Sequence, residues 1–247
     1  MAHPFEIVVE QALEATPEQT WEALTSGTAM DAWFMGTNEV VPGVGGSVRT
    51  VGPGFTLEST ITTWEPAQRF VHTTAQGDDG RLMTFAYEIE GRSGGGTLLR
   101  FVHSGFLPGD DWEDEVDALG VGDPAYMRKL ATYLRHFRGR RAGSIFVFGP
   151  SVSADHFWSV TRAAFGVDHA TARPEDPVRA RPAGLDPIDG VVDFVNRDFL
   201  AIRTPDAAIH LIHGISGHSV VEVHRFDDPD PAATERAWSS WLERAFA

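Results

Sequence analysis

GTLLRFVHSGF, at residues 96–106, is the stretch from which we predict the fold. Apolar and polar residues alternate along it, so that Leu99, Phe101 and His103 fall on one face of a strand and Arg100 falls on the other. A strand with this pattern buries one face of a sheet and exposes the other. We therefore expect it to lie within an antiparallel sheet that covers an apolar core.

A long helix is predicted after this strand, from Pro124 to about Arg138. Asp123 is suited to cap its N-terminus, and a proline is favoured in the first turn. Apolar residues then recur every three or four positions, at Met127, Leu130, Leu134 and Phe137. The acidic segment at residues 110–115 is expected to be a solvated loop rather than a cation site. A strand followed by a long amphipathic helix indicates a curved sheet that grips a helix.

Further strands are predicted in quick succession along the first half of the chain. They cover Phe5–Leu13, Ser47–Val51, Phe55–Trp64, Arg69–Ala75, Leu82–Glu90 and Thr97–Gly105. The later links between them are short and rich in turn-forming residues, which is typical of an antiparallel meander. A helix capped by Thr16, with Gln19 completing a capping box, and a short helix at Thr28–Phe34 are also expected.

The same order of elements begins again after Arg141. Strands are predicted at Ser144–Phe148, Gly190–Val195, Phe199–Thr204, Ala207–His213 and Ser219–Phe226, with a helix capped by Ser153 and a last helix opened by Asp230-Pro231. The second half has room for about two fewer strands than the first. In their place lies a Pro-rich stretch at Pro174–Pro187, which we interpret as an extended loop. We therefore predict a domain at residues 1–141 and a shorter α+β unit at residues 142–247, a truncated repeat of the first. The alternative is that a common order of elements recurs by chance.

The second unit is expected to pack on the first. With too few strands to close a cavity of its own, it would otherwise leave Trp158, Trp238 and Trp241 in water.

The composition excludes several classes of protein. The chain has 247 residues, 42% of them hydrophobic, a net charge of −15 and no cysteine. The charge argues against nonspecific nucleic-acid binding, and the lack of cysteine excludes disulfides, a thiolate nucleophile and thiolate metal ligands. No apolar run is long enough to span a bilayer, and the N-terminus does not resemble a signal peptide. We expect a cytoplasmic protein that binds no membrane.

No metal site and no cofactor are predicted. His210 and His213 lie in a strand-like run, in which residues three apart point to opposite faces. His218, Glu222 and His224 share one strand face, but we expect them to be exposed polar residues beside a turn.

Four segments of the first unit resemble a known family: TPEQTWEAL at residues 16–24, AWF at 32–34, RFVHT at 69–73 and TLLRFVHSGF at 97–106. Together with the first strand and the closing helix, they resemble a bacterial member of the SRPBCC (START-like) superfamily. Within it, the chain is most similar to proteins that resemble the C-terminal domain of the activator of the ninety-kilodalton heat-shock-protein ATPase. The resemblance covers about residues 5–138, and the second unit is similar, more loosely, to a C-terminal extension of some actinobacterial relatives.

This resemblance implies an α+β fold of the helix-grip type, with a curved antiparallel sheet, a long C-terminal helix and a cavity between them. The family includes ligand carriers, cyclases and chaperone partners, so the fold does not fix the function. The expected cavity lining is mostly apolar and comprises Trp33, Phe34, Phe85, Tyr87, Phe101, His103, Met127 and Leu130. The same residues could instead form a filled core.

Three functions are consistent with the sequence. We favour non-enzymatic binding of a small apolar molecule, in which Tyr87 and His103 lie on neighbouring strands and converge on the ligand. The first alternative is a cyclase or dehydratase of the polyketide type, in which His103, Tyr87 and His72 move protons. No Asp or Glu lies on the inward faces of the strands at residues 82–90 and 97–105, which disfavours this enzyme. The second alternative is a module that interacts with a chaperone ATPase; a homodimer or another protein partner is also left open.

Overall fold

The computed structural model describes residues 2–227 and 230–247 and divides the chain into two compact units, residues 1–140 and 141–247. In the first unit, seven antiparallel strands form one sheet in the order β1-β7-β6-β5-β4-β3-β2. The strands are β1 (Ala2–Leu13), β2 (Thr37–Val40), β3 (Ser47–Gly52), β4 (Phe55–Glu65), β5 (Arg69–Thr74), β6 (Leu82–Gly91) and β7 (Thr97–Pro108). The helices are α1 (Pro17–Thr25), α2 (Gly27–Met30) and α3 (Trp112–Thr132), and α3 ends in a π-helical turn at Tyr133–Phe137.

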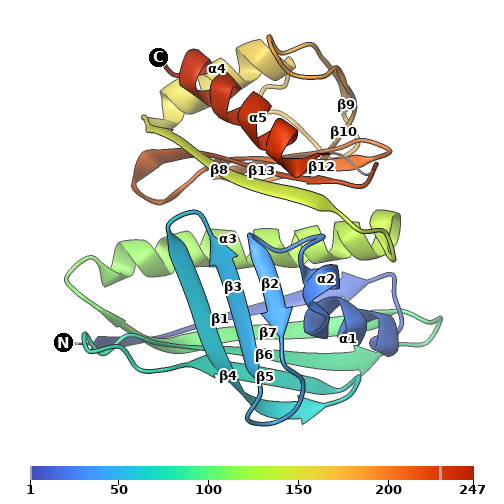
Figure 1. The fold of residues 1–247 in the computed structure, drawn as a ribbon, viewed down its shortest axis with the longest axis vertical. Helices are drawn as coiled ribbons and strands as arrows, with labels where there is room; N and C mark the ends of the chain where they lie inside the picture. Colours follow the sequence, from blue (N-terminus) through green and yellow to red (C-terminus); the bar gives the residue numbers. More distant parts are fainter. Residues whose placement is uncertain (1, 228–229) are drawn as a thin grey trace. The chain divides into compact units, whose positions relative to one another are not determined.

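The sheet of the first unit curves around α3, which contacts β1 and β7 (Figure 1). The predicted alternation along β7 is correct: Leu99, Phe101 and His103 are at most 3% exposed. The capping box of α1 also forms, since Thr16 Oγ1 accepts from the Gln19 amide and Gln19 Oε1 accepts from the Thr16 amide. The first unit is therefore an α+β domain of the helix-grip type.

The start of α3 differs from the prediction. The helix begins at Trp112, so most of the acidic segment expected as a loop forms its first turn, and Asp123 and Pro124 lie inside the helix. Three acidic residues in the first turn favour this start, because the N-terminal end of a helix carries a partial positive charge. Pro124 cannot donate a hydrogen bond to the carbonyl group of Gly120, which weakens the helix there without ending it.

Replacing Gly120 tests the continuity of α3. A Cβ atom added at Gly120 meets no atom within 4 Å, and a helix-interior glycine is less favourable than alanine by roughly 0.5–1 kcal/mol. We expect Gly120→Ala to raise the free energy of unfolding by about that amount in chemical denaturation. A loss of stability would contradict a helix that runs continuously through this segment.

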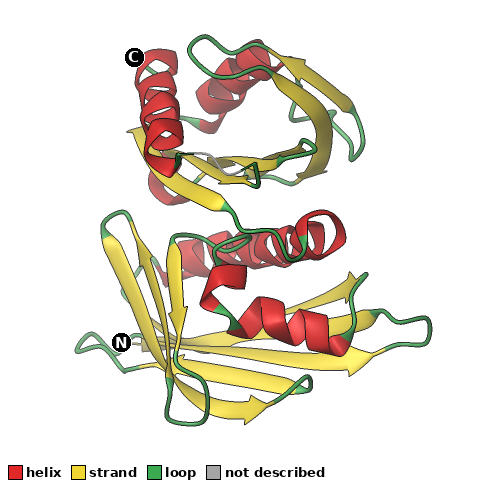
Figure 2. Ribbon diagram, turned by 45° about the vertical axis from the view of Figure 1, so that its right-hand side comes forward, coloured by secondary structure: helices red, strands yellow, loops and turns green. Residues whose placement is uncertain are grey.

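The second unit has six antiparallel strands in the order β8-β13-β12-β11-β10-β9. The strands are β8 (Gly143–Ser151), β9 (Pro177–Ala180), β10 (Ile188–Val195), β11 (Phe199–Arg203), β12 (Ala207–His213) and β13 (His218–Arg225). The helices are α4 (Ala154–Phe165) and α5 (Pro231–Ala245), with a 3-10 turn at Ile215–Gly217. Figure 2 shows the strands and helices of this unit by type.

Two predictions about the second unit were wrong. The Pro-rich stretch is not all loop, because β9 lies within it and pairs with β10. The second sheet is one strand shorter than the first rather than two, since the first has seven strands and the second six. In both sheets the first strand pairs with the last and the others follow in order. The interpretation as a repeat stays a prediction.

The tryptophans of the second unit do not require the first unit for burial. Trp238 and Trp241 belong to a hydrophobic core made only of second-unit residues, and Trp158 packs against that core. Burial of these rings therefore does not require the second unit to pack on the first, and that packing stays a prediction.

Candidate functional site

A wall of aromatic rings lines the inner face of β5, β6 and β7 in the first unit. Cross-strand pairing places Phe85 opposite His103 and Tyr87 opposite Phe101, with ring centroids 4.4 Å and 4.9 Å apart. On the other side, the ring of His72 stacks on Phe85 at 4.9 Å. Phe85 thus lies between two imidazoles, and each of them pairs with a different polar side chain.

His103 pairs with a carboxylate from α3. Its Nδ1 atom lies 3.0 Å from Asp123 Oδ2, and the two side chains are 3% and 13% exposed. In the tautomer of the unprotonated ring whose Nδ1–H donates to Asp123 Oδ2, Nε2 is a hydrogen-bond acceptor. Nε2 is buried and has no hydrogen-bond partner among the described residues. His103 therefore offers one buried acceptor atom beside the aromatic wall.

His72 and Tyr87 are neutral at pH 7. The Nδ1 atom of His72 lies 2.7 Å from Ser59 Oγ, and burial, with a smaller contribution from His103, lowers the pKa of His72 to about 3. Burial, and then the charge of Asp123, raise the pKa of Tyr87 above its usual value. Neither group exchanges a proton readily near neutral pH, which leaves His103 as the candidate acid or base of this wall.

The expected lining residues are nearly all buried, and they lie on the aromatic wall, against α1 and on or beside α3. Phe85, Tyr87, Phe101 and His103 share the wall, with exposures of 9%, 6%, 3% and 2%. Trp33 donates from Nε1 to the carbonyl oxygen of Ala23 at 3.0 Å, which fixes it against α1. Phe34 is half-buried and lies 5.1 Å from the Tyr126 ring of α3, centroid to centroid. Met127 and Leu130 are at most 1% exposed on α3. Their role in ligand binding stays a prediction.

Asp123 is a residue of the candidate site that was not predicted from the sequence. The inward faces of β6 and β7 carry no Asp or Glu in the sequence, but α3 supplies a carboxylate to His103. The signal was present, because Asp123, Met127 and Leu130 follow a spacing of four and three and share one helix face. Asp123 was predicted to cap the helix from outside it, so it was not assigned to this face.

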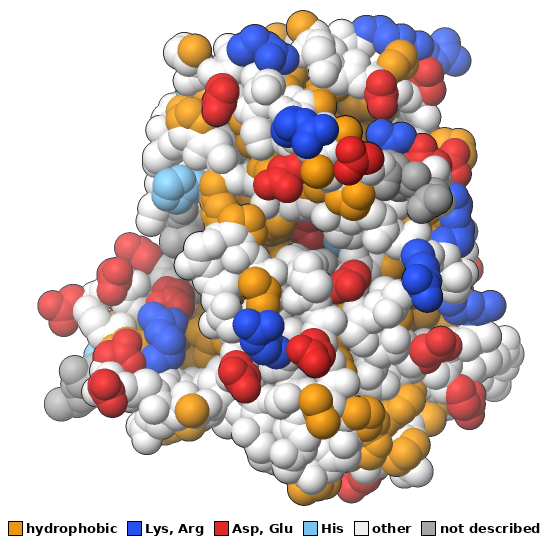
Figure 3. Space-filling view, viewed as in Figure 1, with side chains coloured by type: hydrophobic (Ala, Val, Ile, Leu, Met, Phe, Trp, Pro, Cys, Tyr) orange, Lys and Arg blue, Asp and Glu red, His pale blue; other side chains and the backbone are white. Residues whose placement is uncertain are grey.

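A surface cleft of about 610 Å³ lies in the second unit, between the end of its sheet and α5. Asp186, Ile209, Arg225 and Trp238 are among its lining residues, and none of the expected ligand-binding residues is. Acidic and basic side chains are interspersed over the face shown in Figure 3. The cleft therefore does not coincide with the aromatic wall, where the polar chemistry of the first unit lies.

One prediction about polar residues of the second unit was wrong. Glu222 and His224 were expected to be exposed, but each is 1% exposed; His218 is exposed as expected. Polar residues on one face of β13 suggested a solvent-facing surface, yet both faces of this strand are buried along most of its length.

No helix among the described residues is long and apolar enough to cross a membrane.

Comparisons with known proteins match a family model to most of the first unit. The family described as "Activator of Hsp90 ATPase homolog 1-like protein" matches residues 14–135. No curated protein is significantly similar to the chain. Among solved structures, protein MLL2253 from Mesorhizobium loti is 25% identical, with a TM-score of 0.48, and the match covers 54% of this chain and 98% of that one.

Two further solved structures are similar at lower identity. The Aha1 dimer from Colwellia psychrerythraea is 19% identical, with a TM-score of 0.46, over 55% of this chain and 99% of that one. DynU16, described as a putative protein in the dynemicin biosynthetic locus, is 20% identical, with a TM-score of 0.47, over 96% of each chain.

Proposed function

Because the chain belongs, through residues 14–135, to the family of Activator of Hsp90 ATPase homolog 1-like proteins, we propose that its helix-grip unit binds a small, mostly apolar molecule between the curved sheet and α3. The observation that carries this proposal is the Nε2 atom of His103, which is buried and has no hydrogen-bond partner among the described residues. A buried polar atom left without a partner is destabilising by about 1–3 kcal/mol, and native proteins seldom keep one without a purpose.

The surroundings of Nε2 define the kind of ligand. In the tautomer whose Nδ1–H donates to Asp123, Nε2 accepts, so a partner of Nε2 must donate from an O–H or N–H group. Phe85 and Phe101 flank the imidazole, with ring centroids 4.4 Å and 6.2 Å away, and favour a flat ring. A planar apolar molecule that carries one hydroxyl group fits both requirements.

Naphthol and naphthalene form a matched pair of probes, because only naphthol donates a hydrogen bond. We expect the wild-type protein to prefer naphthol by about 2- to 12-fold, the equivalent of a net hydrogen bond of about 0.5–1.5 kcal/mol. His103→Phe should remove this preference while naphthalene still binds. Fluorescence titration measures both affinities, and native mass spectrometry of freshly purified protein reports any molecule that copurifies.

His156→Phe serves as the control, because His156 is exposed on α4 of the second unit. It should keep the preference for naphthol. A His103→Phe protein with a lower melting temperature and an unchanged preference would show that His103 is structural and would contradict the proposal.

An enzyme is the second candidate, favoured by one observation. A histidine oriented by a carboxylate is the arrangement of a general base, and Asp123 supplies the carboxylate. His72 and Tyr87 add little to this reading, since burial keeps both neutral. Asp123→Asn distinguishes the candidates: it should change the affinity for naphthol only several-fold, but it should lower a turnover that depends on the imidazolium by orders of magnitude. The chaperone alternative, a homodimer and a cytoplasmic location stay predictions.

A further inference from the structure

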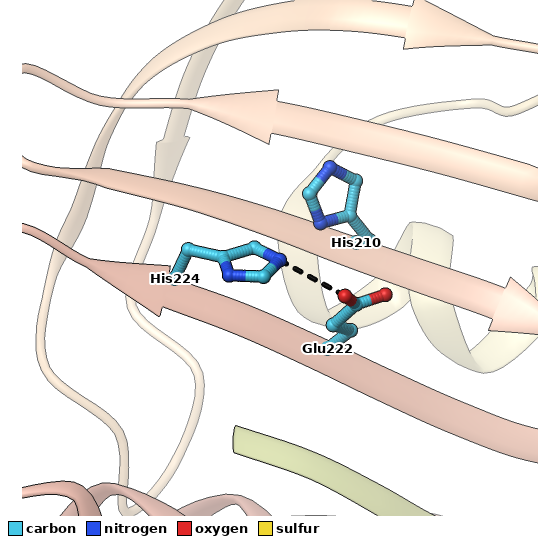
Figure 4. A group of neighbouring side chains, drawn as sticks. All are labelled: His210, Glu222 and His224. Atoms are coloured by element: carbon cyan, nitrogen blue, oxygen red, sulfur yellow. Dashed lines mark hydrogen bonds and ion pairs between the residues drawn. The ribbon is translucent and has the colours of Figure 1, made fainter. Parts of the chain in front are cut away.

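Three polar side chains converge on one face of the second sheet (Figure 4). His210 comes from β12, and Glu222 and His224 come from β13, where Glu222 is the direct cross-strand partner of His210. Their neighbours Ile209, Val221 and Val223 point to the opposite face and belong to the hydrophobic core that includes α5. The three polar side chains are only 1–2% exposed.

The distances within this cluster suit a metal ion. One ligand atom from each residue can be chosen so that all three lie within 4.8 Å of one another. Zinc–nitrogen and zinc–oxygen bonds of about 2.0–2.2 Å place two ligand atoms at most roughly 4.4 Å apart. Small side-chain rotations are therefore enough to bring the three atoms into one coordination sphere.

Ser144, on β8, provides the outer contact that a metal-binding histidine usually has. Its Oγ atom lies 2.9 Å from Nδ1 of His224, while Nε2 of His224 lies 2.9 Å from Glu222 Oε1. A serine hydroxyl both donates and accepts, so it suits either tautomer of the ring. Without a metal ion, Nε2–H donates to Glu222 and Nδ1 accepts from Ser144; with a metal ion on Nε2, the ring proton moves to Nδ1 and donates to Ser144.

We propose that His210, Glu222 and His224 bind one divalent transition-metal ion, with Zn²⁺ as the best fit. Two imidazoles and one carboxylate form a ligand set that zinc and iron use, whereas Ca²⁺ and Mg²⁺ require oxygen ligands. The site lies in the second unit, so it does not depend on the function proposed for the first.

Zinc content after dialysis tests the proposal in the full chain, purified without a histidine tag. The wild-type protein should retain about one zinc ion per chain by elemental analysis and should melt at a higher temperature with zinc than with a chelator. Glu222→Gln preserves the size of the side chain and an oxygen that accepts from His224, yet it should lose the bound zinc and the rise in melting temperature. Ser144→Ala should weaken zinc binding by about 10- to 100-fold.

His218→Gln is the matched control, because His218 is an exposed histidine at the start of the same strand. It should bind zinc like the wild type. Titration with Co²⁺ adds a spectroscopic readout, since visible bands from coordinated cobalt should appear in the wild type and in His218→Gln but not in Glu222→Gln. Melting in chelator shows that each variant is folded. Equal zinc content in the wild type and Glu222→Gln would mean an adventitious ion only, and no zinc in a folded wild type would mean a metal-free hydrogen-bonded cluster; either result overturns the proposal.

Discussion

Acidification below pH 6.5 should destabilise the wild-type protein by about 1.4 kcal/mol for each pH unit through His72 alone. Burial and the neighbouring His103 lower the pKa of His72 from 6.5 to about 3 in the folded protein. The unfolded chain therefore binds a proton that the folded protein excludes. The stability that the neutral ring contributes is complete above pH 6.5 and is lost progressively as the pH falls toward about 3.

The matched variant is His72→Gln, which has no titrating ring and can still hydrogen-bond to Ser59. Chemical denaturation of both proteins from about pH 7 to about pH 4 gives the comparison, since the carboxylates contribute to both and cancel in the difference. Over this range, the free energy of unfolding of the wild type should fall by about 3 kcal/mol more than that of the variant. Parallel pH profiles would show that His72 is accessible to protons in the folded protein.

Gly105→Ala should lower the free energy of unfolding by at least about 3 kcal/mol. Gly105 has a φ angle of +150°, and a Cβ atom there would lie 1.9 Å from the carbonyl oxygen of Leu82 on the neighbouring strand. The clash involves backbone on both sides, so no side-chain rotation relieves it. Either the pairing of β6 with β7 opens or the strands move apart.

Gly94→Ala separates the two effects at this position. Gly94 also has a positive φ angle, +96°, but an added Cβ atom meets nothing within 4 Å. Gly94→Ala should lower the free energy of unfolding only by the roughly 1–2 kcal/mol that a left-handed conformation costs a residue with a Cβ atom. If thermal and denaturant unfolding show the same loss of unfolding free energy for Gly105→Ala and Gly94→Ala, the two strands do not approach each other closely at Gly105.

The strands of the first unit could largely be predicted from the sequence, because a period of two is visible without knowing what covers the sheet. Leu99, Phe101 and His103 were assigned to the buried face of β7 on this basis, and they lie there. The short strand β2 was missed, since four residues, TNEV, are too few to show a period. The strand β9 was missed because Pro177 suggested a loop, although a proline is accepted as the first residue of a strand.

The candidate sites were harder to predict, because each depends on residues far apart in the sequence. His103 was identified as the polar group of the wall, but Asp123 was not paired with it, since Pro124 was interpreted as the start of a helix rather than its interior. In the second unit, Glu222 and His224 were recognised as sharing a face. Whether a polar face is buried cannot be inferred from polarity, which is the same for an exposed surface and for a buried cluster.

Pro124 has a consequence for the ligand binding proposed for the helix grip, since it affects how fast a bound molecule would be exchanged. The helix lacks one backbone hydrogen bond next to Asp123, so this is where α3 bends at the lowest free-energy cost. A bend there would carry Asp123 away from His103 and release the ring from its fixed tautomer. The same bend would then open a passage into the helix grip and free the His103 ring, whose Nε2 atom is the acceptor. A molecule that holds Nε2 would keep the passage closed behind it, and its residence time would be set by the helix as much as by its own contacts.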